Sequence, residues 1–383
     1  MPDSHDDVPI QWPDAAWKRR FRRQILDWFD HHARDLPWRR SPTLYHVWIS
    51  EVMLQQTQVV TVIPYFQRFV AALPDVAALA AADEQQVLRL WEGLGYYRRA
   101  RQLHAAAKKI VADHGGQFPT DIEQVRALPG IGRYTAGAIL SIATGARHPI
   151  LEANTVRVFS RLIAYRDDPS RSAGQKLLWQ LAEELLPNSR VDAFNQALME
   201  LGSEICWPRE PNCAACPVAK LCPTRELGLQ DRIPIAKRRT QYEDVHEAAI
   251  VVRRGSAALL RRCQPGERWA GLWDFPRFAV SNGNGDDAPA PPRPTVDHVE
   301  QTDLAHRTRE LTGITVSLGE QLATFKHGVT RFRITLTCWE AQRQAGRIRG
   351  SELVWQPVHE LDHMPLSTTG RKIAKLLQRS PRN

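Results

Sequence analysis

Apolar side chains recur with a helical period over most of the first 230 residues. In residues 87–94, for example, they stand three or four positions apart, which is the spacing of one buried helix face. Gly-Gly and Pro-Gly pairs, as at 115–116 and 129–130, separate such segments and are typical of turns between helices. We therefore predict an all-helical domain over residues 13–230.

The period changes after residues 231–244, a basic segment that contains a proline and that we interpret as a linker. Residues 246–255 and 330–341 alternate apolar with polar positions and are rich in β-branched side chains, which predicts strands. Between them, residues 306–314 have the pattern of a short helix. The sequence thus predicts a small α+β domain over residues 245–375.

Three segments have no such periodicity. Residues 1–12 are short, polar and contain proline, so we expect them to be disordered. Residues 282–294 have low complexity and predict a loop inside the second domain. Residues 376–383 are predicted to form a basic tail.

Composition adds a partner class to this picture. The chain has 383 residues, with 51 lysines and arginines against 42 acidic residues and a net charge of +9, which favours a polyanionic partner. No segment approaches the ~20 apolar residues of a membrane helix. The acidic start of the chain lacks the apolar core of a secretory signal. We expect a monomeric protein of a reducing, cytoplasmic compartment.

Four cysteines stand within 17 residues, spaced C-x6-C-x2-C-x5-C: Cys206, Cys213, Cys216 and Cys222. In a reducing compartment four close thiols predict a metal centre, because thiolates are soft ligands. Zinc sites normally show two C-x2-C pairs farther apart, so the spacing favours a [4Fe–4S] cluster. A zinc knuckle is the alternative.

The segment 128–133, Leu-Pro-Gly-Ile-Gly-Arg, lies between two predicted helices. Gly130 and Gly132 permit a tight turn and a close approach of the backbone to another molecule. The free N–H groups of the helix that follows form an anion site suited to a phosphate. This pattern predicts a contact to a phosphate group, although it is also compatible with a simple tight turn.

Glu51 is an acid on an otherwise apolar helix face. Its helical neighbours are Val47, Trp48 and Leu54. Burial disfavours the charged form of a carboxyl group, so the pKa of Glu51 should rise and the group should stay protonated near neutral pH. A general acid needs that property. The alternative is a buried glutamate that hydrogen-bonds to nearby backbone.

These motifs resemble a known family. The cysteine spacing at the end of a helical domain and the hairpin before a helix resemble the endonuclease III superfamily of DNA glycosylases, whose cluster is structural. WISEVMLQQTQV at 48–59, LPWR at 36–39 and GLGYYRRA at 93–100 resemble the MutY-type adenine DNA glycosylases. The resemblance spans roughly residues 17–375.

The resemblance implies roles for single residues. Glu51 would protonate the adenine leaving group after the base has left the duplex. Gln56, Thr57 and Tyr96 would approach the base opposite the target. A further set would lie near the flipped adenine or bind DNA: Arg34, Trp38, Arg39, Gln196 and, in the hairpin, Gly130 and Gly132. For Trp38, packing in the core is the alternative.

The second carboxylate departs from the family pattern. Glycosidic cleavage leaves cationic character on the sugar, which an ionised carboxylate stabilises. Where the family has aspartate and glycine, this chain has Glu152 and Ala153. Either Glu152 does the same work with an adjusted backbone, or the protein binds the lesion and cleaves slowly, because a misplacement of about 1 Å can cost a hundredfold in rate.

Tyr134 follows the hairpin arginine, where lyases of the superfamily have a lysine that forms a Schiff base with the sugar. Without that amine, covalent strand cleavage is not expected. The resemblance therefore implies a monofunctional glycosylase. We expect the Tyr134 hydroxyl to bind the second carboxylate or the nascent sugar cation, with simple packing as the alternative.

The second domain resembles the Nudix-related domain of adenine glycosylases through GLWDFPRF at 271–278. A hydrolytic Nudix helix needs several acids to hold magnesium, and only Glu310 remains here, so we exclude nucleotide hydrolysis. The family loop that probes oxidised guanine corresponds to Val329, Thr330 and Arg331. Only Thr330 keeps the family's hydroxyl, and an edge strand is the alternative interpretation.

We therefore predict a two-domain protein, with an all-α helix-hairpin-helix domain and a [4Fe–4S] loop at 206–222 followed by an α+β Nudix-like domain. The predicted activity is the hydrolytic removal of adenine that is mispaired with 8-oxoguanine or guanine in double-stranded DNA. The alternatives are a thymine or uracil mismatch glycosylase and a non-catalytic lesion-binding protein. The second of these rests on the departure at Glu152.

Overall fold

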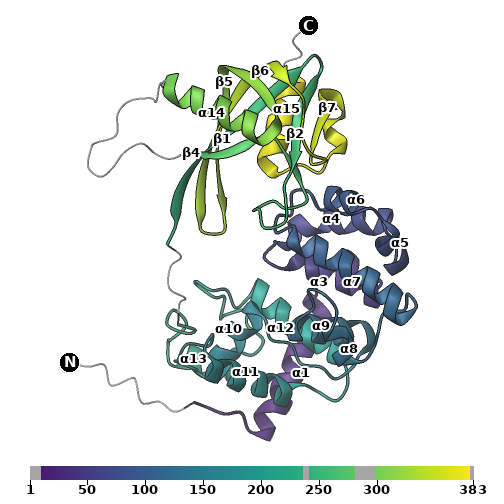
Figure 1. The fold of residues 1–383 in the computed structure, drawn as a ribbon. Coiled ribbons are helices and arrows are strands. Elements are labelled where there is room, and N and C mark those ends of the chain that lie inside the picture. The colour runs from purple at the N-terminus through teal and green to yellow at the C-terminus, as the bar shows by residue number, and fades with distance from the viewer. Residues whose placement is uncertain (1–9, 236–240, 281–297, 380–383) are drawn as a thin grey trace, which may run out of the picture. The chain divides into compact units, whose positions relative to one another are not determined.

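The structure is a computed structural model that describes residues 10–235, 241–280 and 298–379 (Figure 1). Both predicted domain types are present, an all-helical part and a part built on a mixed sheet. None of the helices in the described ranges combines the length and the apolar character that a membrane crossing needs.

The chain divides into two compact units. The first, which we call the helical unit, comprises Met1–Ala82 and Arg98–Arg238. The second, the C-terminal unit, comprises Asp83–Tyr97 and Arg239–Asn383. The C-terminal unit thus includes a short segment from the middle of the predicted helical domain, which the hydrophobic pattern did not predict.

The helical unit contains twelve α-helices and one 3-10 helix within the described residues. They are α1 (Ala15–His32), α2 (Pro37–Arg40), α3 (Leu44–Leu54), α4 (Val59–Ala72), α5 (Val76–Ala81), α7 (Arg98–His114), α8 (Ile122–Arg126), α9 (Arg133–Thr144), α10 (Ala153–Leu162), α11 (Ser172–Leu185), α12 (Val191–Glu204), η1 (Ala219–Leu221) and α13 (Pro223–Glu226).

Large aromatic side chains hold these helices together. Phe21 of α1, Phe159 of α10 and Phe194 of α12 are fully buried in one apolar cluster. The rings of Phe21 and Phe194 meet edge to face with their centroids 6.1 Å apart. Each such ring stabilises the fold by roughly 1.5–3 kcal/mol through burial alone. This cluster fixes α10 and α12, which carry several of the predicted site residues.

The C-terminal unit is built on a seven-stranded sheet in the order β3-β2-β1-β6-β5, with β4 paired to β1 and β7 paired to β2. Strands β1 and β6 are parallel, and the other pairs are antiparallel. Its elements are α6 (Glu84–Trp91), β1 (Glu243–Arg254), β2 (Ala257–Arg262), β3 (Trp273–Asp274), β4 (Arg277–Val280), α14 (His298–Thr312), β5 (Ile314–Val329), β6 (Phe332–Gly346), β7 (Leu353–Pro357), η2 (Val358–His363) and α15 (Thr368–Arg379).

Helices cover both faces of the central strand β1. Val251 packs on one face in a cluster with Ile373 of α15. Ile250 packs on the other face in a cluster with Leu304 of α14. Because both faces are covered, six consecutive residues of β1 are buried, and the alternation expected of a half-exposed strand is lost there.

The predicted strands 246–255 and 330–341 correspond to β1 and β6. Several bounds differ from the prediction: β1 begins inside the predicted linker, β6 extends beyond residue 341 to Gly346, α14 begins eight residues before the predicted helix 306–314, and α15 extends into the predicted tail to Arg379. Helix α15 extends that far because its apolar face is buried, with Leu377 at its end. The predicted loop 282–294 and residues 1–9 of the predicted disordered N-terminus lie outside the described residues.

Candidate active site

Glu51 lies on α3 with 6% of its surface exposed, between fully buried apolar side chains. The hydroxyl of Tyr134 donates a hydrogen bond to Oε2 of Glu51 at 2.6 Å. Burial is the main cause that raises the pKa of Glu51 to about 7. The charge of Glu152 adds to the rise, whereas the Tyr134 hydrogen bond and Arg39 oppose it. The expected rise in the pKa of Glu51 is thus present.

Tyr134 is the second residue of α9, directly after the glycine hairpin. Its hydroxyl also lies 3.4 Å from the sulfur of Met199 on α12. Burial, followed by the charge of Glu51, raises the pKa of Tyr134 well above its ordinary value, so the phenol stays neutral. Tyr134 therefore binds the first carboxyl group. No hydrogen bond joins it to the second carboxylate within the described residues, whereas its expected contact with the sugar cation stays a prediction.

Glu152 is the N-cap of α10, and its two carboxylate oxygens each accept a backbone N–H, one from Asn154 and one from Thr155, both at 2.8 Å. The Thr155 hydroxyl accepts the N–H of Glu152 at 2.7 Å, which completes a capping box. Burial raises the pKa of Glu152, and the two backbone hydrogen bonds oppose that rise. Ala153 begins the helix without a positive φ, so glycine is not required there.

A third buried acid, Glu200 on α12, was not among the residues predicted from the sequence. Arg34 donates to it from Nε at 2.7 Å and from Nη2 at 2.9 Å, and Arg39 donates from Nη2 at 2.9 Å. These two guanidinium groups outweigh the effect of burial and lower the pKa of Glu200. Its neighbours on the helix face, Gln196, Ser203 and Glu204 among them, are mostly polar, so the pattern that marked Glu51 is absent and did not identify it.

Two predicted contacts to the flipped base have packing partners of their own. Trp38 is 7% exposed and meets the ring of Phe66 edge to face, with centroids 5.4 Å apart. The amide of Gln196 donates to the carbonyl of Asp192 within α12 at 3.2 Å. For both residues, contact with a base stays a prediction.

Arg99 holds the turn that follows α3. Its Nη1 donates to the carbonyl oxygens of Val52 at 2.8 Å and Met53 at 3.0 Å, and its Nη2 donates to the Thr57 hydroxyl at 3.3 Å. Gln56, between these contacts, has a φ of +57°, a conformation that needs such support. Arg99 was not predicted, although it lies in the GLGYYRRA segment that carries the family resemblance.

The predicted hairpin connects α8 to α9. Gly130 has a φ of +78°, and a Cβ there would lie 2.8 Å from the Cβ of Gln102, so only glycine fits. Gly132 is the N-cap of α9 and provides no capping side chain. The hairpin therefore leaves the first N–H groups of α9 without a capping side chain, and the binding of an anion there stays a prediction.

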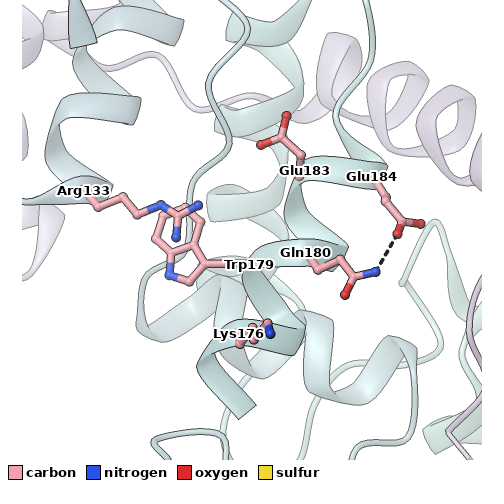
Figure 2. A pocket seen from close by; sticks show the side chains of 6 residues that line it. All are labelled: Arg133, Lys176, Trp179, Gln180, Glu183 and Glu184. Atoms are coloured by element: carbon pink, nitrogen blue, oxygen red, sulfur yellow. Dashed lines mark hydrogen bonds between the residues drawn. The ribbon is translucent and has the colours of Figure 1, made fainter. Parts of the chain in front are cut away.

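Arg133, the first residue of α9, stacks on an aromatic ring beside the hairpin. Its guanidinium carbon lies 3.7 Å from the centroid of the Trp179 ring (Figure 2). The two side chains line a cavity of about 320 Å³ together with Lys176, Gln180, Glu183 and Glu184. A basic and an aromatic side chain thus lie immediately next to the candidate phosphate site.

The four cysteines lie on the loop between α12 and α13, and each is a free thiol. Burial raises the pKa of Cys216 to about 12, and the other three thiols contribute to the rise, so the four groups are within electrostatic reach of one another. Within the described ranges, no three side chains of metal-binding type are arranged as a metal site. The donor set is nevertheless all thiol, which suits a soft metal centre.

Arg161 of α10 donates hydrogen bonds to the cysteine loop and to the segment that follows it. Its Nη1 donates to the sulfur of Cys206 at 3.2 Å and to the carbonyl oxygen of Trp207 at 2.7 Å. Its Nη2 and Nε donate to the carbonyl oxygens of Gln230 and Ile233, both at 2.8 Å. A buried arginine that satisfies this many carbonyl groups orders the loop, and it was not predicted from the sequence.

Thr330 lies at the tip of the β5–β6 hairpin in the C-terminal unit, with a φ of +53°. Its hydroxyl donates to the carbonyl oxygen of Val329 at 2.7 Å. Arg331 lies 3.7 Å from the carboxylate of Glu243. The predicted recognition segment is therefore an exposed turn between the edge strand β5 and the inner strand β6, and contact with a lesion stays a prediction.

Comparisons with known proteins identify relatives for both units. The model of the HhH-GPD superfamily base excision DNA repair protein matches residues 49–184, and that of the NUDIX domain matches residues 248–376. The adenine DNA glycosylase of Homo sapiens is 41% identical over 276 residues, which cover 70% of this chain and 50% of the human protein. The chain thus spans about half the length of that relative.

Two further relatives cover more of their own length. The adenine DNA glycosylase of Buchnera aphidicola subsp. Schizaphis graminum (strain Sg) is 35% identical over 259 residues, which cover 67% of this chain and 75% of that protein. The solved structure of a thermostable thymine-DNA glycosylase is 30% identical with a TM-score of 0.51, and the match covers 55% of this chain and 98% of that one. The helical unit therefore has a glycosylase fold.

Proposed function

This chain belongs to the adenine DNA glycosylase family, and we propose on that premise that it removes adenine from double-stranded DNA by hydrolysis of the N-glycosidic bond. The mispair that we propose is adenine opposite 8-oxoguanine or guanine. The base must leave the duplex before an enzyme can reach its glycosidic bond. We further propose that the protein acts as a monomer.

The buried carboxyl group of Glu51 is the observation that carries this proposal. With a pKa of about 7, a large share of the group is protonated near neutral pH. Tyr134 donates to Oε2, so the proton of the neutral acid resides on Oε1 and can pass to a ring nitrogen of the flipped adenine. Protonation turns the base into a better leaving group.

Glu152 has the complementary role in this proposal. Two backbone N–H groups at the start of α10 favour its ionised form. An ionised carboxylate beside the sugar stabilises the cationic character that develops as the base departs. Water then attacks the sugar, and Tyr134 offers no amine for a Schiff base. The expected product is an abasic site in an unbroken strand.

We propose that Cys206, Cys213, Cys216 and Cys222 hold a [4Fe–4S] cluster. Four thiols on one loop suit it, and Arg161 and Gln230 already donate to two of the sulfurs, as N–H groups commonly do around such clusters. The cluster would cross-link the loop without an open position for substrate, so its role is structural. Iron and sulfide content, compared between the wild type and Cys213→Ser, tests this proposal.

One experiment tests the activity. A duplex with adenine opposite 8-oxoguanine is incubated with the protein, and one half of the sample is then heated in alkali. Strand breaks that appear only after alkali support hydrolytic base removal without a lyase step. Breaks without alkali contradict the monofunctional mechanism, and the absence of breaks in both halves contradicts the activity.

A second candidate function is the removal of thymine from mismatches. Its support is the 30% identity of the helical unit to the thymine-DNA glycosylase structure. A parallel duplex with thymine opposite guanine distinguishes the two, because breaks in that duplex alone would favour the thymine activity. A protein that binds the adenine duplex tightly and leaves it intact would instead be a lesion-binding protein.

A further inference from the structure

Residues Asp83–Tyr97 belong to the C-terminal unit, although they lie inside the span 49–184 of the HhH-GPD match. The chain leaves the helical unit after Ala82, forms α6 and a turn, and returns at Arg98. The segment that includes Tyr96 therefore folds together with the NUDIX-related part of the chain.

Helix α6 is attached to the rest of the C-terminal unit by polar side chains. Gln85 accepts the indole N–H of Trp273 at 2.9 Å and donates to the carbonyl oxygen of Gly271 at 3.1 Å. Arg89 donates to the carbonyl oxygen of Asp362 at 2.7 Å. These bonds have a defined direction, so they fix the position of the helix along the sheet edge more specifically than apolar contact would.

The strongest attachment is an ion pair at the end of α6. Arg371 donates from Nε to Oε1 of Glu92 at 2.6 Å and from Nη2 to Oε2 at 3.0 Å. The side chains are only 13% and 8% exposed. The remaining donors of Arg371 reach Leu361, Asp362 and Met364 at 2.6–3.0 Å, so all five of its N–H groups are bound. A two-pronged pair of this kind fixes both distance and angle.

A strained turn follows the ion pair immediately. Gly93 and Gly95 have φ values of +102° and +70°, and Tyr96 has a φ of +47°, which is unfavourable for a residue with a side chain. The turn is closed by bonds from the Trp91 indole to the Gly95 carbonyl and from the Gly93 N–H to the Tyr97 hydroxyl, both at 3.2 Å. Half of the surface of Tyr96 is exposed, at 50%. Strain of this kind persists only where the surroundings fix it.

We propose that Arg371 is a positioning residue that acts through Glu92. It fixes the turn and so presents the Tyr96 ring to the base opposite the target, which links this ring to the same unit that carries the Thr330 hairpin. This inference rests on the proposed function, in which the protein binds mispaired duplex DNA. In consequence, recognition of the opposite base depends on an ion pair that does not itself touch DNA.

The test uses the full-length protein with Arg371→Met and a matched control, Lys375→Met, which removes a charge from the exposed side of the same helix. The first measurement is amide hydrogen exchange over residues 92–97. The second is the affinity for a duplex that carries a non-cleavable adenine analogue opposite 8-oxoguanine, relative to the same analogue opposite thymine. The third is the single-turnover rate of adenine release at saturating protein.

Arg371→Met should accelerate exchange in the turn and lower the preference for the 8-oxoguanine duplex about tenfold, while the saturated single-turnover rate changes less than about threefold. Lys375→Met should leave the preference unchanged. Tyr96→Ala should lose the preference as well, and adding Arg371→Met to it should cause no further loss, because both changes remove the same contact. Additive losses would show that Arg371 acts by another route.

Unchanged exchange in the turn, or faster exchange with an intact preference, would overturn the proposal. If Arg371→Met does not fold, Glu92→Gln replaces it, because this change keeps the shape of the side chain and removes its charge. Smaller changes in the same direction are then expected in amide exchange and in duplex preference. A wild-type protein that releases no adenine contradicts the proposed function alone. Exchange and binding still decide the role of Arg371 in that case.

Discussion

Both units bury an acidic side chain almost completely, and the two sites differ in what surrounds it. Glu51 in the helical unit is 6% exposed, and its hydrogen-bond donor is the neutral phenol of Tyr134. Asp274 in the C-terminal unit is 3% exposed and is bound by the Ser367 hydroxyl at 2.7 Å and by the guanidinium of Arg277 at 3.4 Å. Burial raises the pKa of both acids, but only at Asp274 does an adjacent cation oppose it as the next largest influence.

On the proposed function, this difference distinguishes the acid that we propose as proton donor from an acid held in a structural ion pair. Arg277 also binds Glu247, which accepts a second bond from Arg268 at 2.7 Å, so two guanidinium groups hold the acids of this cluster. Within the described residues, Glu51 accepts its hydrogen bond from a neutral phenol, and Arg39 lowers its pKa only through its charge, so the pKa stays raised at about 7. A buried acid is available for chemistry where its counter-charge is missing.

The largest effect should come from Glu51→Gln. The amide keeps the size of the side chain and cannot donate a proton as an acid, so single-turnover adenine release should fall about a thousandfold. Duplex affinity should change little. Asp274→Asn is the matched control in the C-terminal unit, and its saturated release rate should stay near that of the wild type. Equal rates for Glu51→Gln and the wild type would remove Glu51 from the reaction.

The wild type and Glu51→Gln should also differ in how their folding stability depends on pH. The folded-state pKa of Glu51 lies above its unfolded value of 4.5, so the wild type loses stability as pH rises from about 4.5 through about 7. The full rise corresponds to up to about 3 kcal/mol. Glu51→Gln lacks this loss and should gain stability relative to the wild type at pH 8 but not at pH 5. Urea unfolding at both pH values measures the difference.

The rate at which the wild type releases adenine should depend on the same ionisation of Glu51. Because the acid must be protonated to act, the single-turnover rate should fall as pH rises above about 7. A rate that is flat from pH 6 to pH 9 would indicate that another group supplies the proton.

Glu152→Gln should have the next largest effect on release, a fall on the order of a hundredfold, because a neutral amide stabilises the sugar cation poorly. A glutamine can still accept one of the two N–H groups at the start of α10, so the melting temperature should change little. Glu152→Asp sharpens the test. Recovery with aspartate but not glutamine assigns the role to charge, and equal loss in both assigns it to the shape of the cap.

Patterns within one segment were enough to predict much of the fold and part of the candidate site. The apolar neighbours of Glu51 predicted its burial, and Gly130 with Gly132 predicted the hairpin, because helix faces and tight turns are set by residues close in sequence. Strands β1 and β6 were predicted from alternation together with their β-branched side chains. The burial of the acid and the position of the hairpin thus followed from local sequence.

Contacts between distant segments could not be predicted in this way. Arg34 binds Glu200 across 166 positions, and Arg99 reaches Val52 across 47, and no local pattern specifies either partner. Helical periodicity likewise shows that α6 has a buried face but not which unit covers it. The bond from Tyr134 to Glu51 was not predicted for the same reason: the second carboxylate was one of its two expected partners, and the two carboxyl groups stand 101 positions apart in the sequence.

The smallest effect should come from Ser367→Ala in the C-terminal unit. The fully buried hydroxyl donates to Asp274 at 2.7 Å and accepts the N–H of Gly370 at 2.9 Å at the start of α15. Its removal should cost about 1–2 kcal/mol of folding stability, since two buried groups lose a partner. The single-turnover rate of adenine release at saturating protein should stay unchanged, because Ser367 binds Asp274 and the guanidinium of Arg277 already lies next to that carboxylate. A fall in that rate as large as the fall for Glu152→Gln would mean that the acid of the C-terminal unit takes part in the chemistry, and the contrast between the two buried carboxyl groups would no longer hold.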